Sequence, residues 1–164
     1  MSTDLFTFDG KRKYLSSQEL DLFIATANTH ERLEVRTLCL VLAHTGCRLS
    51  EALALTPESI DLSQGVVVFQ TLKQRGTVRF RSVPVPSTTL NDLELVHRLR
   101  KLQKTKAKTH SLWPWGRTQA WKHIKTVFEM AGVSGVQASP KGLRHGFAVR
   151  AISVSLEEAE TAGV

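Results

Sequence analysis

Residues 45–53 read Thr45-Gly46-Cys47-Arg48-Leu49-Ser50-Glu51-Ala52-Leu53, and this stretch decides how the chain is interpreted. Upstream of it, leucine and valine residues recur at near-helical spacing over 33–42, which predicts a helix. Gly46 is a typical C-cap for that helix, because glycine adopts the left-handed backbone conformation without steric cost. A second, short helix is expected over 49–55. The stretch therefore places Arg48 at a junction between two helices.

The remaining patterns predict a mostly helical protein with one small antiparallel β-hairpin or sheet. The capping box Ser16-Ser17-Gln18-Glu19 opens a helix that is expected to reach Ala27. Two β-branched and aromatic runs, 66–69 and 78–85, flank Lys73-Gln74-Arg75-Gly76 and favour a hairpin. Further helices are expected over 89–102, over 118–131, and from Pro140 onward with Leu143, Phe147, Val149 and Ile152 facing a core. With helix in excess, this order indicates an α+β fold.

Positive charge is concentrated in the middle of the chain. The 164 residues carry a formal net charge of +7, yet residues 73–125 hold thirteen lysines and arginines against two acidic residues. The rest of the chain is net acidic. A local cationic excess is typical of proteins that bind nucleic acid and predicts strongly salt-dependent binding. The alternative is a solvated basic face that only aids solubility.

Several classes of protein are disfavoured by what the sequence lacks. No apolar run approaches the ~20 residues of a membrane span, and the N-terminus shows no signal pattern. Cys39 and Cys47 are too few for a disulfide framework, which favours a reducing compartment. The six histidines show no metal-ligand spacing, and the sequence has neither a glycine-rich phosphate loop nor a nucleophile elbow. We therefore expect no metal and no cofactor.

Two of the three segments that carry candidate chemistry lie in the first half of the chain. In the stretch quoted above, Arg48 follows a helix end and Glu51 comes three residues later, at the start of the next helix. In Thr71-Leu72-Lys73-Gln74-Arg75-Gly76, Lys73 lies on the edge of the predicted hairpin. Each segment alone has an ordinary structural explanation, such as a helix-start ion pair between Arg48 and Glu51.

The third segment is Ser139-Pro140-Lys141-Gly142-Leu143-Arg144-His145-Gly146-Phe147-Ala148, at the start of the last helix. In order and approximate spacing, the three segments resemble the arginine box, hairpin lysine and H-x-L-R-H box of the tyrosine recombinase (phage integrase) family. The resemblance covers about residues 15–153 and implies the catalytic-domain fold of DNA breaking-rejoining enzymes. Within the third segment, we expect His145 to pack or hydrogen-bond rather than to move protons.

The resemblance implies cleavage of a phosphodiester by a tyrosine, which leaves a 3′-phosphotyrosine and a free 5′-hydroxyl. Negative charge grows on the non-bridging oxygens, and Arg48 and Arg144 would each engage them with a bidentate guanidinium group. Lys73 would protonate the leaving 5′-oxygen, and Glu51 would orient its neighbours. Lys141 stands where the family usually has histidine, and it would contact phosphate as a point charge.

Other basic residues of the hairpin are expected to contact DNA. They are Arg75, Arg79 and Arg81. Arg75 is an alternative to Lys73 as the hairpin cation, because the sequence does not determine the register of the two strands.

The nucleophile of the family lies near the C-terminus, whereas the only tyrosine here is Tyr14 and the segment after residue 153 is acidic. We therefore expect a lead-in over 1–14, a catalytic domain over 15–153 that is incomplete at its C-terminal end, and a divergent acidic tail over 154–164. The hypothesis is a recombinase-like domain of the bacterial cytosol or nucleoid that binds double-stranded DNA but does not cleave it alone. Self-association or a full-length recombinase would be further partners. The alternatives are a DNA-binding accessory or inhibitory protein and a non-functional mobile-element remnant.

Overall fold

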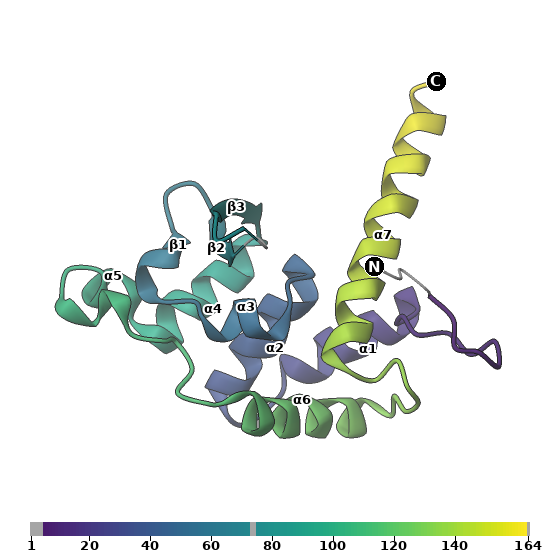
Figure 1. Cartoon of the computed structure of the whole chain (residues 1–164), viewed down its shortest axis with the longest axis horizontal. Helices are drawn as coiled ribbons and strands as arrows, with labels where there is room; N and C mark the ends of the chain where they lie inside the picture. The colour runs from purple at the N-terminus through teal and green to yellow at the C-terminus, as the bar shows by residue number, and fades with distance from the viewer. Residues whose placement is uncertain (1–4, 73–74, 164) are drawn as a thin grey trace.

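The computed structural model describes residues 5–72 and 75–163, as helices arranged around a three-stranded sheet (Figure 1). The chain begins with α1 (Ser17–Ala27), α2 (Leu33–Thr45), α3 (Leu49–Leu53) and the 3-10 turn η1 (Pro57–Ser59). The sheet follows, with β1 (Ile60–Asp61), β2 (Val66–Leu72) and β3 (Val78–Pro84). The remaining elements are α4 (Ser87–His97), α5 (Leu99–Leu102), η2 (Lys106–Thr109), α6 (Arg117–Ala131) and α7 (Pro140–Thr161). The mostly helical α+β class is confirmed.

Helix α2 is the centre of the core and contacts α1, α4, α6 and α7. It is apolar on most of its surface, as expected for a helix that is covered on several sides. Val35, Leu38, Cys39 and Val41 are fully buried. The predicted C-cap is confirmed, because Gly46 ends the helix in the left-handed conformation with φ of 65°. The chain is thereby turned into α3 at the surface of this core.

The sheet is antiparallel in the order β1-β2-β3, and the predicted hairpin is confirmed. Strand β1 was missed because two residues give no periodic signal. In the hairpin, Phe69 pairs with Arg81 and Thr71 pairs with Arg79. Paired residues of an antiparallel ladder share a face, and so do alternate residues of one strand. Phe69, Thr71, Arg79 and Arg81 therefore lie on one face of the hairpin.

Helix α7 packs only through its first turns. Leu143 is buried, and Phe147 and Val149 are half-buried. The expectation that Ile152 faces a core is wrong: its side chain is 62% exposed, because no other element covers the distal part of the helix (Figure 1). Although α7 has 22 residues, neither it nor any other helix in the described part of the chain is long and apolar enough to cross a membrane.

The helix predicted over 89–102 is divided into α4 and α5. Arg98 separates them with a left-handed φ of 51°, while α4 already begins at Ser87. This break carries no sequence signal, because residues other than glycine rarely adopt a positive φ. The break directs α5 and the lysine-rich turn η2 to the end of the molecule beyond the sheet (Figure 1).

Candidate active site

The junction between α2 and α3 fixes the backbone of Arg48. The buried Cys47 follows Gly46 and donates its amide N–H to the hydroxyl of Thr45 at 3.3 Å. Arg48 then caps α3, and its own amide N–H donates to Oε1 of Glu51 at 2.9 Å. The family resemblance and the helix-start explanation both expected Arg48 close to Glu51. The structure links them through the main chain of Arg48, and Arg48 itself is exposed.

Two glycines bring the start of α7 close to the rest of the molecule. Ser139 caps the helix and accepts a hydrogen bond from the amide N–H of Gly142 at 3.0 Å. A Cβ at Gly142 would overlap the carbonyl of the preceding loop, and one at Gly146 would press on the backbone of Leu15. Glycine is needed at Gly142, where a Cβ would overlap the backbone, and it allows the close approach of Leu15 at Gly146. The first turns of α7 are therefore seated directly on the core.

Arg144 reaches from α7 to the α2–α3 junction. Its Nη1 donates to the carbonyl of Gly46 at 3.3 Å and lies 3.8 Å from Oε1 of Glu51. Burial and the nearby positive charge of Arg48 lower the pKa of Arg144, and Glu51 opposes this effect. Arg144 stays charged at neutral pH, since an arginine is not deprotonated in proteins. Like charges repel, so an anion bound next to both Arg48 and Arg144 would be favoured by their combined positive charge.

Glu51 organises the surrounding cations. Its side chain is only 8% exposed and accepts a bidentate pair from Arg81, at 2.5 Å from Nη1 and 3.0 Å from Nη2. The hydroxyl of Thr71 donates to it at 2.9 Å. Burial opposes the charge of Glu51, but the hydrogen bonds from Arg81, the Arg48 amide and Thr71 outweigh burial and lower its pKa to about 2. Glu51 is therefore ionised at neutral pH. We call Arg48, Arg81, Arg144 and Glu51 the arginine cluster.

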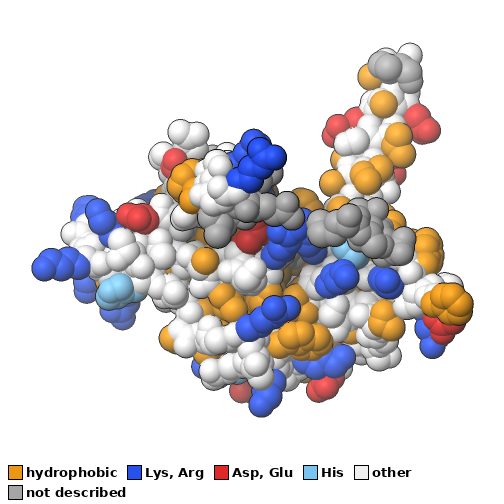
Figure 2. All heavy atoms as spheres, in the orientation of Figure 1, with side chains coloured by type: hydrophobic (Ala, Val, Ile, Leu, Met, Phe, Trp, Pro, Cys, Tyr) orange, Lys and Arg blue, Asp and Glu red, His pale blue; other side chains and the backbone are white. Residues whose placement is uncertain are grey.

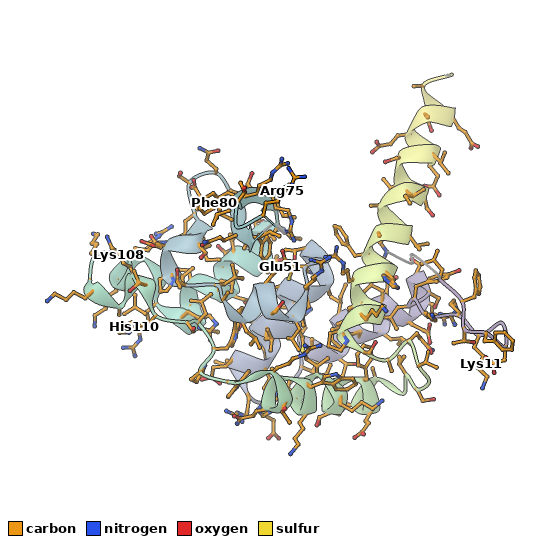
Figure 3. The ribbon with its side chains drawn as sticks, in the orientation of Figure 1. Lys11, Glu51, Arg75, Phe80, Lys108 and His110 are labelled. Carbon is orange, nitrogen blue, oxygen red and sulfur yellow. The ribbon has the colours of Figure 1, made fainter. Side chains whose placement is uncertain are left out.

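Arg81 is the member of this cluster that sequence reasoning did not place there. The structure directs its guanidinium group to Glu51 and over the ring of Phe69, 4.8 Å from the ring centroid, and the expected contact of Arg81 with DNA stays a prediction. Figure 3 labels Glu51 at this junction of the sheet with α3. Arg81 and Glu51 are 30 positions apart in the chain, so only the hairpin register could have revealed the pair. The side chain of Arg81 remains 40% exposed.

His145 lies next to the arginine cluster among further cations. Its half-buried ring has Nδ1 buried, with no hydrogen-bond partner in the described part of the chain. Burial, followed by Lys141, Arg144 and Lys13, lowers its pKa, so the ring is neutral at neutral pH. Lys141 is exposed. Lys13 was not singled out in the sequence; it lies here because the amide N–H of its neighbour Leu15 donates to the carbonyl at the start of α7.

The other hairpin residues are placed less closely. Lys73 lies outside the described residues. Arg75 is exposed in the turn, where Figure 3 labels it away from Glu51. Arg79 is exposed and shares the hairpin face of Arg81. Contact of these residues with DNA stays a prediction.

Tyr14, the only tyrosine in the sequence, is held within the lead-in segment. Its ring lies edge-on to Phe6, with 6.1 Å between the centroids, and the guanidinium carbon of Arg12 lies 5.6 Å from its ring centroid. The carbonyl of Tyr14 also accepts a hydrogen bond from Arg12 at 2.8 Å. Tyr14 therefore has a structural role in this segment.

The surface formed by these elements is suited to binding anions. Lys and Arg side chains gather between the hairpin and the lower part of α7, whereas the far end of α7 carries apolar and acidic ones (Figure 2). Within residues 5–72 and 75–163, no three His, Cys, Asp or Glu side chains are grouped so that they could hold a metal ion. Guanidinium groups bind phosphate in bidentate fashion, so the chemistry available here is recognition of a phosphate.

The comparison with protein families identifies the class to which this domain belongs. The Phage integrase family matches residues 13–156, so the chain belongs to the tyrosine recombinase, or phage integrase, family. Tyrosine recombinase XerD of Yersinia pestis is 30% identical over 150 residues, which cover 86% of this chain and 49% of that protein. XerD of Vibrio cholerae is 27% identical and covers 86% and 48%. The chain thus spans about half the length of the curated relatives it matches.

Solved structures show the same fold. XerA recombinase superposes with a TM-score of 0.68 at 23% identity, over 85% of this chain and 50% of that one. XerH recombinase, bound to its difH substrate in a pre-cleavage complex, gives a TM-score of 0.66 at 20% identity, over 83% and 41%. The Tn1549 transposon integrase, in complex with circular intermediate DNA, gives 0.65 at 17% identity, over 89% and 54%. At these identities the likeness concerns the fold.

Proposed function

We propose that this chain binds duplex DNA by holding a backbone phosphate between Arg48 and Arg144. The observation that carries the proposal is the arginine cluster, in which the guanidinium groups of Arg81 and Arg144 approach the carboxylate of Glu51. The exposed Arg48 adds a third positive charge, so the site is net positive. The DNA complexes of XerH and the Tn1549 integrase support the choice of ligand. In the cleavage reaction of the family, the same two arginines would stabilise the pentavalent phosphate, and Lys73 and Lys141 would assist at the leaving and non-bridging oxygens.

The test is binding to a fluorescein-labelled DNA duplex, measured by fluorescence anisotropy across a salt series. Two charge-assisted contacts are lost in Arg48→Ala/Arg144→Ala, so we expect affinity to fall by about 100-fold at fixed salt. The slope of log affinity against log salt should become shallower by about one, because both arginines are proposed to hold a single phosphate.

A matched control has the same net charge as the double variant but leaves the proposed phosphate pocket intact. Arg117→Ala/Lys122→Ala removes two exposed cations from α6, which runs along the edge of the molecule away from the hairpin (Figure 1). We expect this control to bind nearly as tightly as the parent. Equal loss in both double variants, with unchanged melting temperatures, would show that the basic surface acts without a defined phosphate pocket.

We further propose that the 164 residues do not cleave DNA alone. The family reaction needs a tyrosine at the phosphate, and Tyr14 is engaged by Phe6 and Arg12. Incubation with a suicide substrate, followed by denaturing electrophoresis, should yield no covalent protein–DNA adduct. An adduct that disappears in Tyr14→Phe would overturn this part of the proposal.

Other recombinase copies are proposed as partners. The distal part of α7 exposes Ile152, Val154 and Leu156, by 62%, 46% and 61%. An apolar strip of this kind favours association with another surface, so we propose self-association or binding to a full-length recombinase. An accessory or inhibitory role, favoured by the same strip, predicts that the chain lowers strand exchange by a full-length relative.

Because the curated relatives are bacterial recombinases, we place this activity in the bacterial cytosol or nucleoid.

A further inference from the structure

We propose that Arg81 is a positioning residue: it occupies Glu51, thereby keeps Arg144 available for phosphate, and fixes the β2–β3 hairpin to α3. This inference rests on the proposed phosphate pocket. It differs from a direct DNA-contacting role for Arg81, because the partner of Arg81 in the structure is a carboxylate of the protein itself.

Every acceptor site of Glu51 is occupied. Oε1 accepts from the Arg48 amide at 2.9 Å and from Nη2 of Arg81 at 3.0 Å. Oε2 accepts from Nη1 of Arg81 at 2.5 Å and from the Thr71 hydroxyl at 2.9 Å. An ionised carboxylate offers about four lone-pair sites, so these four hydrogen bonds fill it.

Arg144 lies close to Glu51 but does not hydrogen-bond to it. Nη1 of Arg144 lies 3.8 Å from Oε1 of Glu51 and hydrogen-bonds to the carbonyl of Gly46 instead. If Arg81 were removed, two acceptor sites of Glu51 would open within reach of Arg144. A bidentate pair between Arg144 and Glu51 would then form, because guanidinium and carboxylate match in geometry and charge. Arg144 would be neutralised by the protein and lost to the ligand.

Arg81 also connects the two strands of the hairpin to α3. Besides Glu51, it donates from Nη1 to the Thr71 hydroxyl at 3.0 Å and covers the ring of Phe69. Phe69 is fully buried, so this end of the hairpin is anchored in the core. Arg81 therefore links both strands and Glu51, and it sets the distance between the hairpin and the phosphate pocket.

The test is whether a second substitution, at Glu51, restores the DNA affinity lost with Arg81. A direct contact between Arg81 and DNA would not be restored in this way. Arg81→Met should lower affinity for duplex DNA by about tenfold or more in the anisotropy assay, since it removes a cation and also sequesters Arg144. Adding Glu51→Gln should restore most of the lost affinity, because a neutral amide no longer captures Arg144. The matched control is Arg81→Met with Glu58→Gln, which has the same net charge but neutralises an exposed acid with no salt bridge among the described residues.

The outcomes separate this inference from the proposed function. Rescue by Glu51→Gln but not by Glu58→Gln supports positioning. Equal rescue by both, or by neither, overturns it and assigns Arg81 to direct or general electrostatic contact. Failure of the phosphate pocket itself is recognised independently, as undiminished binding by Arg48→Ala/Arg144→Ala. If Arg81→Met melts below the assay temperature, Arg81→Lys takes its place in the same cycle, because lysine keeps the charge and loses the bidentate pair.

Discussion

The ring of Phe147 on α7 lies so close to Gly46 at the end of α2 that a Cβ on Gly46 would overlap two atoms of the ring. The same glycine has a left-handed φ of 65° and supplies the carbonyl that receives Arg144. Gly46 thus ends α2, leaves room for Phe147 of α7, and accepts a hydrogen bond from Arg144 of the proposed pocket. The packing of α7 against α2 and the position of Arg144 therefore both depend on Gly46.

Gly46→Ala should destabilise the fold by about 3 kcal/mol, the sum of the left-handed penalty and the overlap with Phe147. The control is Gly132→Ala, where φ is 72° and nothing lies within 4 Å of the added Cβ. It should cost only about 1 kcal/mol, from backbone strain alone. Urea denaturation of both variants measures the difference, and equal losses would contradict a close contact between Phe147 and Gly46.

Stability should decline in mild acid because of His97, which is buried beside Trp113 with its Nε2 2.8 Å from the Thr37 hydroxyl. Burial lowers its pKa to about 4 from an ordinary value of 6.5. The unfolded chain therefore binds the proton first, and the stability contribution is complete above pH 6.5 and is lost as the pH falls toward 4. The expected loss is about 1.4 kcal/mol per pH unit in this window.

Urea titrations at pH 7.5 and pH 5 test this prediction, with His97→Gln as the comparison. The variant is less stable at pH 7.5 but has no imidazole to protonate, so its dependence on pH should be shallower. Identical slopes for the two proteins would assign the acid sensitivity to the other histidines with lowered pKa values, His44, His123 and His145.

Glu51→Ala should cost about 2–3 kcal/mol, because it leaves the Arg48 amide, the Thr71 hydroxyl and Arg81 without their acceptor. Glu58→Ala removes an exposed carboxylate and should stay within about 0.5 kcal/mol of the parent. Since the pKa of Glu51 is lowered to about 2 from 4.5, its contribution is complete above pH 4.5 and disappears as the pH falls toward 2. Thermal melts at pH 7 and in an acid series measure both effects.

Ile152→Gln/Leu156→Gln should leave the free energy of unfolding within about 0.5 kcal/mol of the parent, since both side chains are exposed. Sedimentation velocity should show weaker self-association of this variant. Leu22→Gln/Leu95→Gln is the control, because it removes two exposed leucines from α1 and α4. If the control lowers association equally, the contact is not specific to α7.

Local signals in the sequence predicted much of the fold. The capping box at Ser16 and the C-cap at Gly46 are both observed, because each depends on the chemistry of a few neighbouring residues. The break at Arg98 was not predicted, since a left-handed arginine is set by tertiary packing. The exposure of Ile152 was not predicted either, because helical periodicity shows which residues share a face but not what covers that face.

The site was foreseen in part. Motif order indicated Arg48, Glu51 and Arg144, and in the structure the Glu51 carboxylate binds the Arg48 amide and lies 3.8 Å from the Arg144 guanidinium group. The pairing of Arg81 with Glu51 could not be derived, because one residue of slip in the hairpin turns a side chain to the other face. From sequence alone, Arg75 and Arg81 were therefore equivalent hairpin cations.

The contact between Arg144 and Gly46 joins residues 98 positions apart, and the backbone bond between Leu15 and Gly142 spans a still longer loop. Closing such loops costs chain entropy that only the assembled core offsets. No fragment of the sequence can therefore display the arginine pair: a partly folded chain has the charge but lacks the geometry. By mass action, a ligand that requires this geometry must raise the thermal midpoint of the whole domain. Binding of such a ligand would therefore be thermodynamically linked to the stability of the whole domain.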